Sequence, residues 1–359
     1  QQSLEAPRAG RVSRRAVLAG IGAASCLAFE VGSPAAPGGK SRPPVLSTFG
    51  MRSAAAAEAV AGPMIVQNDV SVPMKAGSIL LANVYRPSAA GKYPVMVAMS
   101  AYGKDVRPQD FGPQAVQEER EHYPAFCTGG SRCRYMPWEA PDPEYWVANG
   151  YVVVHVDARG AGRSPGYLDP FSAQETRDYY DAIEWAAAQA WSNGRVGLLG
   201  LSYYAMLQWL VAAMRPPHLV AIIPWEGASD WFRDATHQGG IPSNTFWSGL
   251  FWDHVVQRQQ YGNPDGMVDS VTHQRTNGPL LNRQLLQGNR ISFAEQIAAH
   301  YLDDEWMKSR SPILERIEVP LLSAGNWGAM GLHLRGNTEG YLRAGSKSKW
   351  LDMQVGLHF

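Results

Sequence analysis

Residues 195–205 read Arg-Val-Gly-Leu-Leu-Gly-Leu-Ser-Tyr-Tyr-Ala, and the interpretation of the whole chain starts from this stretch. A short apolar run, 195–199, has the length of a buried strand, and residues 203–214 have the composition of a helix. A strand, a sharp turn that carries a serine and a helix together form a nucleophile elbow. The turn lifts the hydroxyl clear of the sheet, and the helix N-terminus stabilises negative charge. Ser202 is therefore the candidate nucleophile.

The elbow departs from the common pattern Gly-x-Ser-x-Gly. Gly200 fills the first glycine position, but Tyr204 stands where the second glycine is usual. Small residues flank the serine of an elbow because neighbouring backbone passes close to it. On this pentapeptide alone, an ordinary strand-to-helix turn stays open as the alternative interpretation.

Outward from the elbow, short apolar runs alternate with amphipathic segments, which is typical of a mostly parallel sheet covered by helices. Residues 93–99 and 151–157 are near-continuous apolar runs, as expected of strands that are buried on both faces. Residues 174–189 place Tyr179 and Ile183 on one stripe of a helix. The other expected elements are strands at 80–85, 219–223, 319–323 and 349–355 and a helix at 332–342.

Residues 200–205, Gly-Leu-Ser-Tyr-Tyr-Ala, resemble the Gly-x-Ser-Tyr-x-Gly/Ala elbow of the cocaine-esterase and X-prolyl dipeptidyl-peptidase family of serine hydrolases. In that family the small residue comes three places after the serine, and Ala205 fills this place. Residues 157–166 resemble the same family, and the resemblance extends over residues 66–359. It implies an α/β-hydrolase fold, with a mostly parallel central sheet flanked by helices. It also implies hydrolysis of ester or amide bonds, X-Pro dipeptidyl bonds included, through an acyl-enzyme at Ser202.

The chain is expected to divide into a leader and a core that an insertion interrupts. Residues 1–62 are expected to be an export signal and a disordered linker, and the core is expected to occupy 63–229 and 313–359. In 230–312, Gln, His, Asn and Trp become frequent and strand-like runs vanish, which predicts a helical cap over the active site. The C-terminal β-sandwich domain of the family has no counterpart here, so we expect the chain to be a piece of a longer protein.

Arg14 and Arg15 precede a mildly apolar run, 16–29, in the layout of an export signal that resembles a twin-arginine signal. A disordered N-terminal extension is the alternative. The run is too short to span a bilayer, so stable membrane insertion is not expected. Export to the periplasm or the medium would place the protein in an oxidising compartment, where Cys127 and Cys133 are expected to form a local disulfide.

Charge and composition exclude several classes of partner. The chain carries 32 Lys and Arg and 32 Asp and Glu, and this balance disfavours nucleic acid or an anionic membrane as the partner. The 12 Trp and 15 Tyr favour a small-molecule ester or amide, or a short peptide, with a hydrophobic group, although core packing accounts for most of them. No dinucleotide glycine fingerprint follows a strand and no zinc-ligand spacing occurs, so we expect neither a cofactor nor a metal.

The resemblance also implies an oxyanion hole. The family builds it from a tyrosine hydroxyl after an early strand and from the backbone N–H that follows the serine. Tyr102, in the segment Ser-Ala-Tyr-Gly-Lys-Asp of 100–105, would supply the hydroxyl, and Tyr203 would supply the N–H. Such donors contribute about 3 kcal/mol each to stabilising the oxyanion. The alternative for Tyr102 is a loop residue that packs on the core.

The general base is expected after the last strands, because α/β-hydrolases run in the order Ser, acid, His. His358 follows the strand expected at 349–355 and fits this order. His333 competes with it, but His333 falls inside the helix expected at 332–342, where a packing role is favoured. The histidines expected to be structural or to face the substrate include His237, His254, His273 and His300.

The acid of the triad is missing from its expected place. The family usually has an aspartate just after the strand that corresponds to 319–323, but residues 324–329 here read Ala-Gly-Asn-Trp-Gly-Ala. Asn326 can orient a histidine but cannot stabilise an imidazolium by charge, and an amide in place of the acid can cost about 10⁴ in turnover. Three hypotheses stay open: Asn326 serves poorly, another carboxylate such as Glu339 reaches the histidine, or the site is impaired. The alternative to a serine hydrolase is therefore a catalytically impaired α/β-hydrolase fold that acts as a binding protein, ahead of a cofactor-using oxidoreductase.

Overall fold

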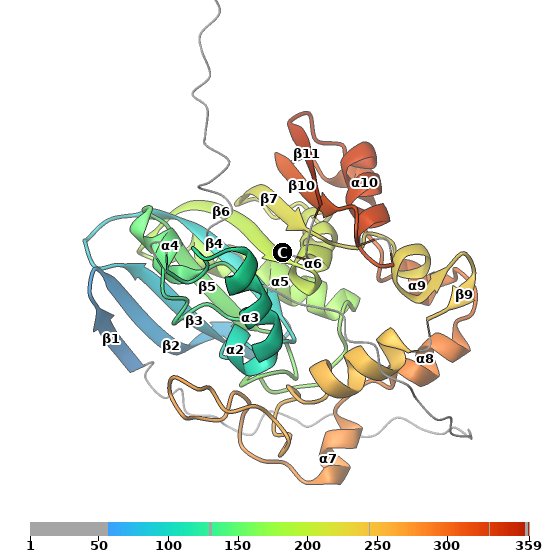
Figure 1. Cartoon of the computed structure of the whole chain (residues 1–359), viewed down its shortest axis with the longest axis horizontal. Helices are drawn as coiled ribbons and strands as arrows, with labels where there is room; N and C mark the ends of the chain where they lie inside the picture. Colours follow the sequence, from blue (N-terminus) through green and yellow to red (C-terminus); the bar gives the residue numbers. More distant parts are fainter. Residues whose placement is uncertain (1–56, 129–130, 244, 330, 356–357, 359) are drawn as a thin grey trace, which may run out of the picture.

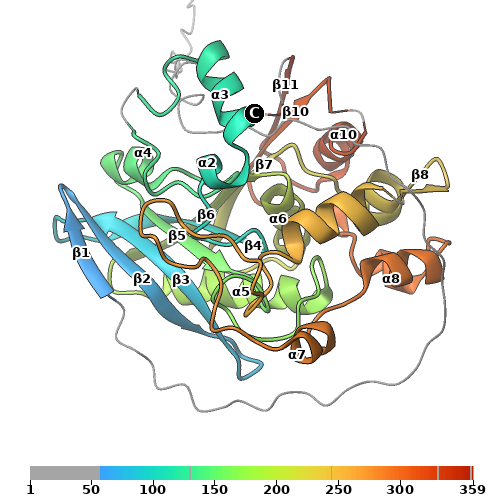
Figure 2. The same ribbon diagram turned by 60° about the horizontal axis from the view of Figure 1, so that its bottom comes forward.

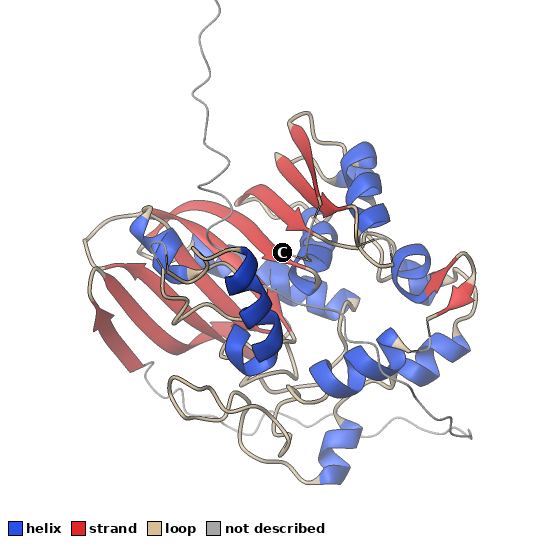
Figure 3. Cartoon of the chain, viewed as in Figure 1, coloured by secondary structure: helices blue, strands red, loops and turns tan. Residues whose placement is uncertain are grey.

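A nine-stranded sheet forms the centre of the molecule, with helices on both of its faces (Figure 1, Figure 3). The computed structural model describes residues 57–359 apart from 129–130, 244, 330, 356–357 and 359, so the expected export signal lies outside the described residues. Across the sheet the strands are β1 (Ala57–Ala61), β2 (Met64–Pro73), β3 (Ile79–Pro87), β5 (Val152–Asp157), β4 (Tyr93–Ser100), β6 (Ser192–Leu201), β7 (Leu219–Trp225), β10 (Leu321–Asn326) and β11 (Lys349–Gln354).

Strands β5, β4, β6, β7, β10 and β11 run parallel to one another, whereas β1, β2 and β3 pair antiparallel at one side of the sheet. The register pairs Leu201 of β6 with Trp225 of β7, and Trp225 with Ala324 of β10. Ser100 of β4 pairs with Asp157 of β5. Parallel strands end at the same edge of a sheet, so the residues that follow β4, β6, β7 and β10 gather at one edge.

The middle of the sheet is buried on both faces. The helices that pack on it are α4 (Pro143–Ala148), α5 (Ala173–Ala187), α6 (Tyr203–Ala212) and α10 (Leu334–Arg343), whereas α2 (Pro108–Phe111) and α3 (Pro113–His122) pack against each other in the segment between β4 and α4. Val153 of β5 clusters with Val147 of α4, whereas Val152 and Val154 belong to the core that α5 and α6 share on the opposite face. A strand covered on both faces needs a near-continuous apolar sequence, which explains why β5 could be predicted from its composition.

The predicted strands and helices are confirmed, with their ends shifted by a few residues, and one part of the predicted division is wrong. Residues 57–61, which were assigned to the linker, form β1 and pair antiparallel with β2. Only two residues, Gly62 and Pro63, separate the two strands, so the chain turns back and β1 pairs with the free edge of β2. The sheet therefore begins before residue 63.

The segment between β7 and β10 consists mainly of short helices and loops (Figure 2). Two strands of two residues each, β8 and β9, form a small hairpin within it, which the sequence did not predict. No helix among the described residues is long and apolar enough to cross a membrane. The elements of the segment are η2 (Trp231–Thr236), β8 (His237–Gln238), β9 (Ile241–Pro242), η3 (Phe246–Val256), α7 (Arg283–Gly288), α8 (Phe293–Ala299), α9 (Glu305–Lys308) and η4 (Leu314–Arg316).

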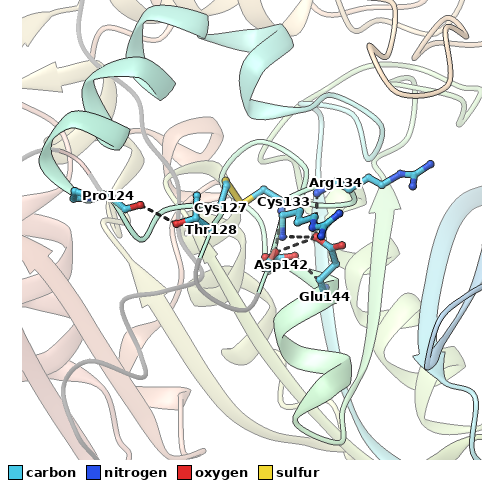
Figure 4. The surroundings of a disulfide bond; sticks show 9 residues. Pro124, Cys127, Thr128, Cys133, Arg134, Asp142 and Glu144 are labelled. Carbon is cyan, nitrogen blue, oxygen red and sulfur yellow. Dashed lines mark hydrogen bonds between the residues drawn. A yellow bond between two sulfur atoms is a disulfide. The ribbon is translucent and has the colours of Figure 1, made fainter.

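A disulfide joins Cys127 to Cys133 in the loop between α3 and α4, which confirms the expected pairing (Figure 4). The carboxylate of Glu144 secures the same loop, because it accepts hydrogen bonds from the backbone N–H groups of Arg132, at 2.9 Å, and Arg134, at 3.2 Å. This loop leads directly into the edge of the sheet where the parallel strands end.

Candidate active site

Ser202 occupies the sharp turn between β6 and α6 in a strained backbone conformation. Its φ of 52° and ψ of −111° lie in a region that non-glycine residues rarely adopt. Three hydrogen bonds hold the turn. The N–H of Leu201 donates to the carbonyl of Glu139 at 3.0 Å, the N–H of Ser202 to that of Trp225 at 3.0 Å, and the N–H of Met206 to that of Ser202 at 2.9 Å. The chain thus forms the strand, turn and helix of an elbow, and not an ordinary turn.

Two glycines leave room for this turn. A Cβ at Gly200 would lie 2.5 Å from the Cβ of Tyr204, and a Cβ at Gly227 would lie 2.6 Å from the Cβ of Ala205. Both distances are far shorter than a van der Waals contact between carbon atoms. Gly200 therefore leaves room for Tyr204, and Gly227, which lies outside the pentapeptide, leaves room for Ala205. The close approach of Gly227 explains why a small residue is needed at Ala205.

Tyr102 follows β4 and faces the serine. Its hydroxyl lies 3.4 Å from the Oγ of Ser202, and the side chain is buried. Burial, with the charge of Glu139 as a second cause, raises the pKa of Tyr102 well above its ordinary value, so the hydroxyl keeps its proton and stays a donor. The backbone N–H of Tyr203 begins α6 next to Ser202, while the Tyr203 hydroxyl donates to Glu175 at 2.7 Å. The structure therefore places both predicted tyrosines beside Ser202, and their role as oxyanion donors stays a prediction.

His358 contacts two buried carboxylates. Its Nδ1 donates to the carboxylate of Glu226, and its Nε2 lies 3.4 Å from Oε1 of Glu139. Burial lowers the pKa of His358, but the hydrogen bonds and charges of Glu139 and Glu226 outweigh this and raise the pKa to about 10. His358 thus has a partner at each ring nitrogen.

Glu226, which the sequence reasoning missed, is the buried carboxylate that contacts Nδ1 of His358. It comes directly after β7, it is fully buried, and its N–H donates to the carbonyl of Ala324 in β10 at 2.7 Å. In the sheet, β7 lies between β6 and β10, so its end is closer to the elbow than the end of β10. A residue that follows β7 can therefore reach His358, just as a residue that follows β10 could. A carboxylate three residues beyond the strand expected at 219–223 was the available signal.

The assignment of Asn326 as the acid is therefore corrected. Asn326 ends β10, and its Oδ1 accepts the backbone N–H of Gly328 at 2.8 Å, whereas Glu226 holds Nδ1 of His358. Glu339, the other carboxylate considered, lies on α10 with its Oε2 4.0 Å from the guanidinium of Arg343. Neither Asn326 nor Glu339 is thus the carboxylate that contacts Nδ1 of His358. That carboxylate is Glu226.

His333, the competing candidate for the base, packs against His358. It lies at the start of α10, and the two rings stack with their centroids 5.2 Å apart. Burial, aided by the charge of His358, lowers the pKa of His333 well below its ordinary value, so this imidazole is neutral. Two other histidines stack on aromatic rings of the segment between β7 and β10: His237 on Phe232 and His300 on Trp306.

Aromatic side chains from η3 pack against the tyrosines of the site. The ring of Phe251 lies 6.3 Å from the rings of both Tyr102 and Tyr203, and Trp247 contacts Phe251 at 4.8 Å. Within the part of the chain that the structure describes, no group of three or more His, Cys, Asp or Glu side chains is arranged to hold a metal ion. The aromatic rings of η3 thus place apolar side chains next to Tyr102 and Tyr203.

Comparison with known proteins relates the chain to a group of hydrolases. Residues 77–359 match the family described as X-Pro dipeptidyl-peptidase (S15 family). The chain is similar to a cocaine esterase from Rhodococcus sp. (strain MB1 Bresler), with 27% identity over 295 residues, which are 77% of this chain and 46% of the relative. It is also similar to a putative Xaa-Pro dipeptidyl-peptidase from Bacillus cereus, with 28% identity over 182 residues, which are 46% of this chain and 30% of the relative. The chain spans less than half the length of these curated relatives.

A solved structure shows the same architecture. The chain is similar to a CocE/NonD family hydrolase from Staphylococcus aureus, with 36% identity and a TM-score of 0.65. The match covers 82% of this chain and 47% of that one. Together with the family match, this similarity confirms the predicted α/β-hydrolase fold.

Proposed function

The chain belongs to the X-Pro dipeptidyl-peptidase (S15) family, and on this basis we propose that it is a serine hydrolase that cleaves ester or amide bonds through an acyl-enzyme at Ser202. One observation carries the proposal. Glu139, whose carbonyl holds the strained serine turn, contacts Nε2 of a histidine, His358, and Nδ1 of this histidine donates to a fully buried carboxylate, Glu226. A nucleophile, a base and a group that orients the base are the minimum for activating a serine hydroxyl.

In this mechanism each residue has one role. Ser202 Oγ attacks the carbonyl carbon of the substrate while Nε2 of His358 takes the hydroxyl proton, and Glu226 stabilises the resulting imidazolium. The Tyr102 hydroxyl and the Tyr203 N–H donate to the oxygen of the tetrahedral intermediate. His358 then returns its proton to the departing alcohol or amine as the carbonyl–leaving group bond breaks. Water repeats the sequence with the acyl-enzyme, which releases the acid and regenerates Ser202.

The substrate is proposed to be a small-molecule ester or amide, or a short peptide, with a hydrophobic acyl or aromatic group. The apolar surface of Phe251 and Trp247 beside the site supports this choice. The names of the relatives cover both chemistries, since one is a cocaine esterase and another a putative Xaa-Pro dipeptidyl-peptidase. A panel of p-nitrophenyl esters and X-Pro anilides distinguishes an esterase from a dipeptidyl-peptidase.

We also propose that the protein is exported, with Arg14 and Arg15 as part of a twin-arginine signal. The disulfide between Cys127 and Cys133 supports this, because such bonds persist in oxidising compartments. Mass spectrometry of the protein from its native host tests the proposal. Export predicts a shortened N-terminus outside the cytoplasm, and an intact residue 1 in the cytoplasm contradicts it.

Labelling with a fluorophosphonate probe tests the enzymatic function. We expect the wild-type protein to be labelled and the variant Ser202→Ala to remain unlabelled, because the probe reacts only with an activated serine. The hypothesis of an impaired binding protein rested on the missing acid, and Glu226 removes that reason. Absence of labelling in folded wild-type protein would restore that hypothesis.

A further inference from the structure

Glu139 is a buried carboxylate at the active site that the proposed mechanism does not use. It lies in the loop between the disulfide and α4, and only 4% of its surface is exposed. Its backbone is fixed, because its carbonyl accepts the N–H of Leu201 at 3.0 Å and its φ of 59° is one that non-glycine residues rarely adopt. The backbone of Glu139 is therefore held in a fixed position relative to the elbow.

The position of the Glu139 carboxylate relative to His358 is specific. Oε1 lies 3.4 Å from Nε2, on the opposite edge of the ring from Glu226, so the imidazole bridges two buried carboxylates. Burial raises the pKa of Glu139, although the hydrogen bond and the charge of His358 oppose the rise. When Glu139 is ionised it only accepts hydrogen bonds, so its contact with Nε2 requires a proton on that nitrogen as well as on Nδ1. Since Glu226 occupies Nδ1, only Nε2 can take the proton of Ser202. Glu139 and Ser202 therefore compete for the same ring nitrogen.

The charges around His358 favour the imidazolium. Glu139 and Glu226 face it from the loop before α4 and from the end of β7, and His333, which burial keeps neutral, faces it from α10. Tyr102, whose pKa burial and Glu139 raise, also stays uncharged. The two uncharged neighbours, His333 and Tyr102, therefore do not offset the charge of the two carboxylates.

We propose that Glu139 is a positioning residue that holds His358 as an imidazolium through Nε2 in the free enzyme. His358 then becomes a base when it loses this proton to solvent and exchanges the contact with Glu139 for one with Ser202. The inference rests on the proposed function, because it assigns His358 as the base. It adds a consequence: the free enzyme needs a more alkaline pH to become active than His358 and Glu226 alone would require.

The pH dependence of catalysis in the variant Glu139→Gln tests the inference. The acid limb of kcat/KM reports the pKa of the free enzyme, and that of kcat reports the enzyme–substrate complex. An opposite charge within about 4–6 Å raises the pKa of a histidine, and its loss should lower that pKa by about 1 unit or more. We therefore expect the kcat/KM limb of Glu139→Gln to move to lower pH by about 1 unit or more, with a smaller shift in the kcat limb.

Glu144→Gln is the matched control. Glu144 holds the loop that leads to Glu139 but does not contact His358, so this variant loosens the loop without removing charge at the ring. We expect its kcat/KM limb to stay where it is in the wild type. An unshifted limb in Glu139→Gln, or an equal shift in Glu144→Gln, would overturn the inference while leaving the labelling of Ser202 intact. Absence of wild-type labelling would instead defeat the proposed function.

A second measurement does not depend on turnover or on the folding of a Glu139 variant. In Ser202→Ala, nitrogen chemical shifts distinguish a doubly protonated imidazole from either neutral tautomer. We expect His358 to carry protons on both nitrogens at about pH 8, well above the ordinary histidine pKa of about 6.5. A neutral His358 ring at that pH contradicts the proposed role of Glu139.

Discussion

Glu226→Gln is the substitution that most directly tests the arrangement of the triad. The amide is nearly the same size as the carboxylate, and the residue keeps its backbone hydrogen bond to Ala324, so the fold should persist. What is lost is the charge that faces Nδ1 of His358 from a fully buried position. In a serine triad this change costs about 10⁴ in kcat, which corresponds to about 5.4 kcal/mol of transition-state stabilisation.

Asn326→Ala is the paired variant, because sequence reasoning placed the acid there. The Oδ1 of Asn326 accepts the backbone N–H of Gly328, and its amide carries no charge that could stabilise an imidazolium. A hydrogen bond of this kind contributes about 1 kcal/mol, so the expected loss of kcat is less than about tenfold. The assay is hydrolysis of a p-nitrophenyl ester, with active sites counted by fluorophosphonate labelling and folding checked by circular dichroism. A loss of less than tenfold in Glu226→Gln together with a loss of about 10³ or more in Asn326→Ala would refute the assignment of the acid.

Three further predictions follow from the site and its surroundings. Tyr102→Phe should lower kcat by about 10²–10³, with little change in the melting temperature, since it removes an oxyanion donor and no packing volume; unchanged kcat would remove Tyr102 from the site. Replacing both Cys127 and Cys133 by serine should lower the free energy of unfolding in guanidinium titrations by about 2 kcal/mol, and an unchanged value would mean that the short loop is already ordered when unfolded. Burial, opposed by hydrogen bonds from Tyr203 and Phe171, raises the pKa of Glu175 from the ordinary value of 4.5 to about 8. Between these two pH values the folded state binds more protons than the unfolded state, so the free energy of unfolding falls as pH rises through that range. Glu175→Gln should therefore flatten this fall in urea titrations, and a fall as steep as in the wild type would show that Glu175 is ionised in the folded protein.

Much of the fold could be predicted because its signals are local. The valines of β5 form an apolar run because helices cover both faces of the strand. The strand before Ser202, the helix after it and the small Ala205 likewise lie within a few residues of each other. Such features depend on periodicity, residue size and backbone geometry, which a short stretch of sequence contains. Tyr102 also lies directly after an expected strand, and its role was inferred from the resemblance of residues 100–105 to the family.

The partners of His358 could not be predicted in this way. Glu226 and Glu139 precede it by 132 and 219 positions, and neither belongs to the loop where an acid was expected. They meet because β7 lies beside β6 in the sheet and because the carbonyl of Glu139, in the loop before α4, accepts the N–H of Leu201 at the elbow. The lateral order of strands and the path of a long loop are set by packing over the whole molecule, and no local pattern contains them. The sequence by itself therefore determined the candidate nucleophile and its turn, whereas only the tertiary structure decided which carboxylates face His358.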